Sequence, residues 1–215
     1  MKPGTLLVTN TTGSATGTGA VDVKSGGSLG GSGIIAPTGT STIMVSDGNG
    51  PATPHDLVVE SGGKIDLDAF DPTQMPAAVI NTLTIALHAS DAATFQAGSS
   101  VVFDLGPSGV SDKVAFEDLT KNSAQVFFND NQVSLDFLPG ATDGTYTIFT
   151  FDQSDAYSGT LQDGSDFTFN YNPTSITVTV VPEPTIWSLM ACGILLLLVR
   201  RFIVFAYRPE SKGSH

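Results

Sequence analysis

The chain has 215 residues and carries 21 acidic against nine basic side chains, a net charge of −12 at pH 7. An acidic surface excludes nucleic acid as the main partner, because phosphate binding requires a cationic surface. The single cysteine, Cys192, excludes an intramolecular disulfide and any metal site built on several cysteines.

Residues 1–101 contain a sequence repeat with a spacing of 36 residues. Val21–Leu29 aligns with Leu57–Ile65 and, more loosely, with Ala93–Val101. Each copy has alternating apolar residues on either side of a glycine-containing corner. This pattern predicts short strands joined by tight turns.

The repeat predicts an all-β fold in which successive coils stack on one another, a parallel β-helix or β-solenoid. Val23, Val59 and Phe95 are equivalent positions, and stacking them would bury a continuous apolar column. A β-sandwich with similar hairpins is the alternative, but a sandwich does not require glycine at a fixed place every 36 residues. Four further apolar runs would supply the other faces of the coils: Leu6–Val8, Ile34–Ile35, Ile43–Val45 and Leu83–Leu87.

The first of these coils resembles a known repeat. Gly4–Val8, the Gly17–Val21 turn and the Ser25–Gly33 segment are similar to the autotransporter-associated β-strand repeat of large bacterial surface proteins. The resemblance implies a right-handed parallel β-helix with a structural role at the cell surface, and it supplies no catalytic residues. A solenoid that starts at Met1 would also have an open end, whose strand edges invite pairing with another chain.

Residues 102–181 form a second, aromatic-rich segment, which we interpret as wider final coils or as an antiparallel cap on the solenoid. The aromatic side chains are expected in the core rather than on a sugar-stacking platform. Turn-forming clusters such as Pro139–Gly144 separate the runs. The predicted strands are Ala124–Phe128, Val133–Leu138, Thr145–Phe151, Asp166–Tyr171 and Ser175–Val181.

The body contains no recognisable catalytic motif: there is no nucleophile elbow, phosphate-binding loop or clustered zinc signature. His88 is expected to point outward from an alternating strand. Asp66 and Asp68 fall on one face of a predicted strand and Asp71 follows after a turn, so they are the candidates for glycosidic acid/base chemistry or for binding Ca²⁺. We interpret them as solvated surface aspartates and Asn129–Asn131 as a turn, and we predict no catalytic residue, metal or cofactor.

The C-terminal segment predicts a membrane anchor. Thr185 to Val199 contains no charge, Arg200 and Arg201 interrupt the apolar character, and the run resumes until about residue 207. A helix over about 185–207 would be roughly 34 Å long, enough to cross the hydrocarbon core of a bilayer. The basic residues follow the apolar run, so the tail should be cytoplasmic and the body outside. A buried core helix is the alternative.

The same segment resembles the PEP-CTERM sorting domain of Gram-negative bacteria. Pro182, Glu183 and Pro184 match its motif, the apolar run matches its transmembrane helix, and the arginine pair matches its basic stop. The resemblance implies processing by an exosortase, a membrane cysteine protease or transpeptidase that acts on exported proteins. Hosts of this system typically make exopolysaccharide, which implies an outer-surface or biofilm-matrix destination.

The sequence therefore predicts three parts: solenoid repeats over 1–101, a cap or final coils over 102–181 and a sorting signal over 182–215. The predicted function is an exported, non-enzymatic structural or adhesive protein, first anchored in the inner membrane and then placed at the cell surface or in the matrix. Its predicted partners are an exosortase, the membrane and exopolysaccharide. The alternatives are a secreted β-helix carbohydrate-active enzyme and the C-terminal fragment of a larger surface protein. No export signal precedes the body, so we expect a longer precursor or a misplaced start.

Overall fold

The computed structural model describes residues 4–36, 57–67, 80–88, 91–120 and 123–180, and the backbone of residues 42–45. The chain divides into two compact units, 1–180 and 181–215, and every described residue lies in the first. The described structure is almost entirely β, with one turn of 3₁₀ helix, η1, at Pro107–Gly109.

The strands form three sheets, A, B and C, in which each strand pairs with its neighbours in a fixed spatial order. In that order, sheet A contains β1 (Thr5–Val8), β3 (Ser28–Gly31), β7 (Lys64–Asp66), β10 (Ser100–Leu105) and β13 (Gln132–Phe137). Sheet B contains β15 (Tyr157–Ser158), β12 (Val126–Phe128), β9 (Ala93–Phe95), β6 (Leu57–Val59), β2 (Ala20–Val23) and β5 (Thr42–Val45). Sheet C contains β16 (Phe167–Asn172), β17 (Ser175–Val180), β14 (Gly144–Phe151), β11 (Lys113–Glu117), β8 (Thr82–Ala86) and β4 (Ile34–Ile35).

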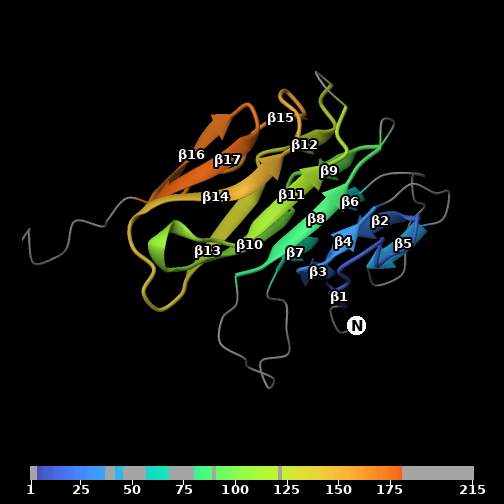
Figure 1. The fold of residues 1–215 in the computed structure, drawn as a ribbon, viewed down its shortest axis with the longest axis horizontal. Coiled ribbons are helices and arrows are strands. Elements are labelled where there is room, and N and C mark those ends of the chain that lie inside the picture. The colour runs from blue at the N-terminus through green and yellow to red at the C-terminus, as the bar shows by residue number, and fades with distance from the viewer. Residues whose placement is uncertain are drawn as a thin grey trace, which may run out of the picture. The chain divides into compact units, whose positions relative to one another are not determined.

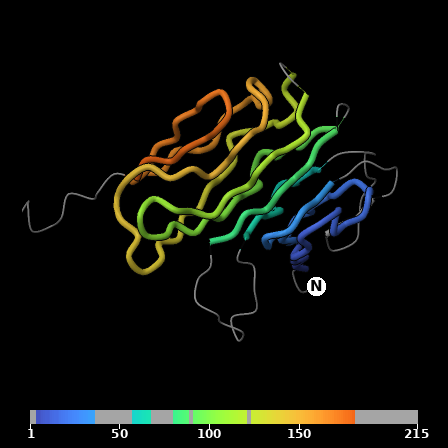
Figure 2. The backbone as a smooth tube through the Cα atoms, viewed as in Figure 1, coloured from blue at the N-terminus to red at the C-terminus, as the bar shows by residue number. Residues whose placement is uncertain are grey.

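The chain visits the sheets in the fixed order B, A, C, which makes the fold a parallel β-solenoid. The order recurs in β2-β3-β4, β6-β7-β8, β9-β10-β11 and β12-β13-β14, so three full turns lead from β2 to β12. Strands of successive coils pair in parallel in all three sheets. Figure 1 shows the coils stacked from blue β2 to yellow β14, and the tube in Figure 2 follows the same winding. The predicted solenoid is confirmed.

The strand register reproduces the 36-residue repeat. Val23 pairs with Val59 and Val59 pairs with Phe95 in sheet B, and all three side chains are fully buried. In sheet A, Leu29 pairs with Ile65, which in turn pairs with Val101. The aligned positions are therefore neighbours in space, and each column of apolar side chains continues through the interior.

The corner of each coil explains why glycine recurs. Gly26, Gly62 and Gly98 all have a positive φ, between 76° and 84°, in the left-handed region that favours glycine. The Gly26 N–H donates to the carbonyl of Gly62, and the Gly62 N–H donates to the carbonyl of Gly98, both at 2.9 Å. The stacked corners therefore form a hydrogen-bonded ladder.

Most aromatic residues of the later coils lie in the core, as expected, but the expectation was wrong for Phe127, Phe137 and Tyr171, which are exposed. Phe149 is fully buried, and its ring centroid lies 5.2 Å from that of Phe103 and 5.1 Å from that of Phe128. Phe95 and Phe116 are also buried, each with its ring centroid 6.3 Å from that of Phe149. These rings come from all three sheets, so the aromatic cluster ties the sheets together.

The two ends of the solenoid are built differently. At the N-terminal end, β5 pairs with the side of β2 that faces away from β6, although β5 follows β4 in the chain. At the other end, β17 pairs antiparallel with β14, and β16 pairs antiparallel with β17. Parallel pairing thus continues beyond residue 101. Among the described strands, the antiparallel pairs are those of β17 with β14 and with β16, and β16 and β17 are shown in orange in Figure 1. The strands predicted for residues 102–181 all occur, with ends within two residues of those expected.

Candidate functional site

The predicted sorting signal lies outside the described residues. This applies to Pro182, Glu183 and Pro184, to the segment from Thr185 to Val199 and to Arg200 and Arg201. Within the part of the chain that the structure describes, no helix is long and apolar enough to cross a membrane.

Of the three candidate aspartates, only Asp66 lies in the described residues; Asp68 and Asp71 lie outside them. Asp66 is on β7, and its Oδ2 lies 2.5 Å from Nζ of Lys64, two residues earlier on the same face of the strand. The carboxylate is therefore paired with an ammonium group. Among the side chains that can be placed, no group of three His, Cys, Asp or Glu residues is arranged to hold a metal ion.

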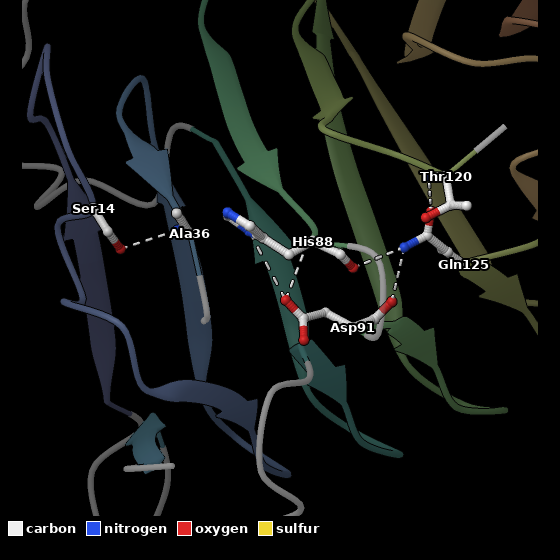
Figure 3. A network of polar contacts seen from close by, with 6 residues as sticks. All are labelled: Ser14, Ala36, His88, Asp91, Thr120 and Gln125. Carbon is white, nitrogen blue, oxygen red and sulfur yellow. Dashed lines mark hydrogen bonds and ion pairs between the residues drawn. The ribbon is translucent and has the colours of Figure 1, made fainter. Parts of the chain in front are cut away.

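His88 follows β8, and its side chain is 57% exposed, as the sequence predicted. Its backbone N–H donates to Oδ2 of the buried Asp91 at 3.1 Å, while its ring Nδ1 lies 4.0 Å from the same oxygen. Gln125, in the next coil, donates from Nε2 to the carbonyls of both residues and accepts from the Thr120 N–H (Figure 3). A second contact in Figure 3, from the Ala36 N–H to Ser14 Oγ, likewise joins two loops. These side-chain hydrogen bonds hold the backbone of the loops in place.

Asn129–Asn131 is a turn, as predicted, and its side chains bind the preceding coil. Asn129 Nδ2 donates to the Phe95 carbonyl at 2.7 Å. The fully buried Asn131 donates from Nδ2 to the carbonyl of Gln96 at 2.7 Å and to Ser99 Oγ at 2.9 Å. In this coil, asparagine side-chain amides make the hydrogen bonds to the preceding coil, whereas in the earlier coils the corner glycines bond through their backbones.

A buried charge cluster was not predicted from the sequence. Lys24 is 5% exposed, its Nζ lies 2.6 Å from Oδ2 of the equally buried Asp22, and it also donates to Glu60 of the next coil. The hydrogen bonds that Lys24 donates to Asp22, and then to Glu60, raise the pKa of Lys24 above its ordinary value of 10.5. Oδ1 of Asp22 is buried without a hydrogen-bond partner. The sequence does contain a signal for this ion pair, because the 36-residue alignment places Lys24 opposite Glu60.

The outer surface of the last three strands of sheet C forms a grid of uncharged polar side chains. On β17, Ile176, Val178 and Val180 point into the core, so the residues between them point outward. The strand register aligns them in three rows of three. The rows are Thr168–Thr179–Thr145, Asn170–Thr177–Thr147 and Asn172–Ser175–Thr150, which we call the hydroxyl–amide face.

The geometry of the hydroxyl–amide face is that of a β-sheet. Neighbours lie about 4.8 Å apart across strands and about 7 Å apart where every second residue of a strand takes part. On β14 the register shift between Thr147 and Phe149 places Thr150 in the third row. Thr179 links the three strands, since its Oγ1 lies 3.1 Å from Thr145 Oγ1 and accepts a hydrogen bond from Asn170 Nδ2 at 2.9 Å. All nine positions are hydroxyl or amide residues, and none carries a charge in a chain whose net charge is −12.

The chemistry of this face is that of a neutral hydrogen-bonding surface. Each hydroxyl donates one hydrogen bond and accepts others, and each amide offers both donors and an acceptor. Such groups offer no strong attraction to an ion, but they complement a surface that is itself rich in hydroxyl groups. The sequence shows the alternation of threonines on single strands, but not that three such strands lie side by side.

Comparison of the chain with protein-family models and with curated proteins found no match.

Proposed function

We propose that this chain is an exported, non-enzymatic structural and adhesive protein of the cell surface or extracellular matrix. In this proposal the solenoid, right-handed as its repeat resemblance implies, is the rigid body. The hydroxyl–amide face is its adhesive surface, and residues 182–215 are its sorting signal. The observation that supports an adhesive role most directly is the grid of nine uncharged polar side chains on adjacent strands.

The ligand class that this grid favours is a neutral polysaccharide. Each hydrogen bond to a sugar hydroxyl replaces one to water, so its net contribution is only about 0.5–1.5 kcal/mol. One sugar unit would therefore bind weakly. A polymer that meets several rows at once, or several copies of the protein, would bind through multivalency.

Loss of hydroxyl groups at the centre of the grid should weaken this binding. For the double variant Thr147→Val and Thr177→Val we expect about 10- to 30-fold weaker retention on an immobilised neutral glucan, because two hydrogen-bonding groups are lost while the branched shape is kept. The measurement is affinity electrophoresis or retention on dextran, with alginate, a polyuronate, as the anionic comparison. The matched control is Thr94→Val, a half-buried outward threonine on β9 of sheet B.

Equal retention of the double variant and the parent would remove the adhesive role from this face. Stronger retention on alginate than on dextran would show that the ligand is anionic and would contradict the choice of a neutral polymer.

The sorting part of the proposal rests on the sequence of residues 182–215 and on its order of motif, apolar run and arginine pair. The full chain, preceded by an export signal, would be expressed in a bacterium that has an exosortase. We expect a surface or released product that lacks everything after about Pro184, identified by intact mass after fractionation. The double variant Pro182→Ala and Pro184→Ala should keep its tail in the inner membrane, whereas Pro209→Ala, beyond the arginine pair, should be processed normally. A parent chain that stays full-length in the inner membrane would show that the tail is only an anchor.

A further inference from the structure

Sheet A ends in β1 on one side and in β13 on the other. Among the described strands, β1 pairs with β3 only and β13 pairs with β10 only. The segment after β15 lies against the start of the β13 edge, where Asn131 and Leu161 form an isolated parallel bridge and the Gln162 N–H donates to the Asn131 carbonyl. The last strand of sheet C is instead β16 of the antiparallel cap, and sheet B ends in the two-residue β15. An edge strand of six residues such as β13 presents a row of free backbone N–H and C=O groups to a partner.

The side chains of β13 that point inward are less buried than those of β10, because no described strand follows β13 in sheet A. Val101, Phe103 and Leu105 of β10 are fully buried, whereas Phe137, which pairs with Leu105, is 54% exposed. Val133 and Leu135 are half-buried at the margin of the core. The C-terminal end of sheet A is therefore an apolar edge without its next layer.

The first strand of sheet A has the pattern that would supply this layer. Leu6 and Val8 point inward and pair with Leu29 and Gly31. Leu6 begins the same column that runs through Leu29, Ile65 and Val101 to Val133. The two-residue spacing of Leu6 and Val8 therefore matches that of Val133 and Leu135.

The strand direction and the absence of charged residues also favour pairing between β1 and β13. Every pair in sheet A is parallel, so β1 of a second copy placed beside β13 would continue the sheet in the same parallel sense. Thr5–Val8 and Gln132–Leu135 contain no charged residue. Two acidic molecules can therefore meet at these strands without placing like charges directly opposite each other.

We propose that copies of this chain assemble head to tail, with β13 of one copy paired in parallel with β1 of the next. Leu6 then lies opposite Val133, and Val8 lies opposite Leu135. The contact is heterologous, because each copy uses a different strand at each end, so it extends into open filaments rather than closing a dimer. This assembly goes beyond the proposed function and depends neither on sorting nor on polysaccharide binding.

The proposed register places Leu7 of one copy directly opposite Ser134 of the next. Both side chains point outward and are exposed, Leu7 by 39%. Within one copy, β1 and β13 are separated by four strand spacings, about 19 Å, so cysteines at these positions cannot form an internal disulfide.

The test uses the full chain in mild detergent, with Cys192→Ser to remove the native thiol. Leu7→Cys combined with Ser134→Cys should give a ladder of covalent dimers, trimers and longer species on oxidation. A mixture of the two single variants should give disulfide-linked dimers and nothing longer. The control pairs Leu7→Cys with Thr94→Cys, an outward position on sheet B, and should give no ladder.

A second pair of variants tests the interaction without a covalent bond. Leu6→Lys and Leu135→Lys each place a charge on one edge, so each alone should stay monomeric in sedimentation velocity. Mixing them should restore a one-to-one dimer through the unaltered β13 of the first and β1 of the second. Val110→Lys, at a 47% exposed residue after η1, should assemble like the parent. Association through the apolar tail would be common to all these proteins. A parent that is monomeric at its highest soluble concentration, or a ladder equally strong with the Thr94→Cys control, would overturn the proposal.

Discussion

Replacing Phe149 with alanine should lower the free energy of unfolding by about 3–5 kcal/mol, the usual cost of removing a buried phenylalanine. The side chain is fully buried on β14, and its ring contacts those of Phe95, Phe103, Phe116 and Phe128. These four come from sheets B, A, C and B in turn, so the cavity would open where the three sheets meet.

The measurement is urea denaturation followed by circular dichroism, with Phe137→Ala as the matched control. Phe137 is 54% exposed, so its truncation should cost less than about 1 kcal/mol. Similar losses for the two variants would contradict the central packing of Phe149, because its ring would then contribute no more than a surface residue.

Replacing Lys24 with methionine should destabilise the fold by about 3–5 kcal/mol, because it leaves the carboxylate of Asp22 buried and uncompensated. Among the described residues, Oδ1 of Asp22 is already buried without a hydrogen-bond partner, so loss of the ammonium adds to an existing deficit. The double variant Asp22→Leu and Lys24→Met should recover most of the loss, since apolar residues can replace a buried ion pair at little cost. Glu60→Gln is the control for the partly exposed partner, whose side chain is 31% accessible, and it should cost little.

The pH dependence of the folding stability follows from the same cluster of Lys24, Asp22 and Glu60. The pKa of Lys24 is raised in the folded state, so its contribution to stability is complete below pH 10.5 and is lost as the pH rises through the folded pKa. The double variant should lack this contribution to the alkaline loss of stability. If the single and double variants unfold at the same urea concentration, the burial of Asp22 does not carry the expected cost.

The sequence predicted the strands and their stacking because a solenoid core is periodic. Val23, Val59 and Phe95 recur every 36 residues, and one turn of the coil brings each of them onto the next. The corner glycines recur with the same spacing, because the equivalent corner residue of each of these coils has a positive φ, which favours glycine.

The sequence patterns did not predict two local features. Strict alternation would point Phe149 outward after the inward Ile148, yet a register shift between Thr147 and Phe149 buries both. β5 follows β4 in the chain but pairs with β2 at the end of the stack, since the free edge of a strand accepts a partner from any point in the sequence.

The sequence by itself determined the all-β class, the coil length and the inward columns, because these depend on periodic spacing along one chain. Only the tertiary structure decided which polar residues meet. Thr145, Thr168 and Thr179 form one row because β17 turns back antiparallel between β14 and β16. Likewise, β1 and β13 have no further described strand beside them, because β5 and β15 add to sheet B and β16 and β17 add to sheet C. Strand order and register depend on contacts between distant segments, and the alternation within a single strand does not specify them.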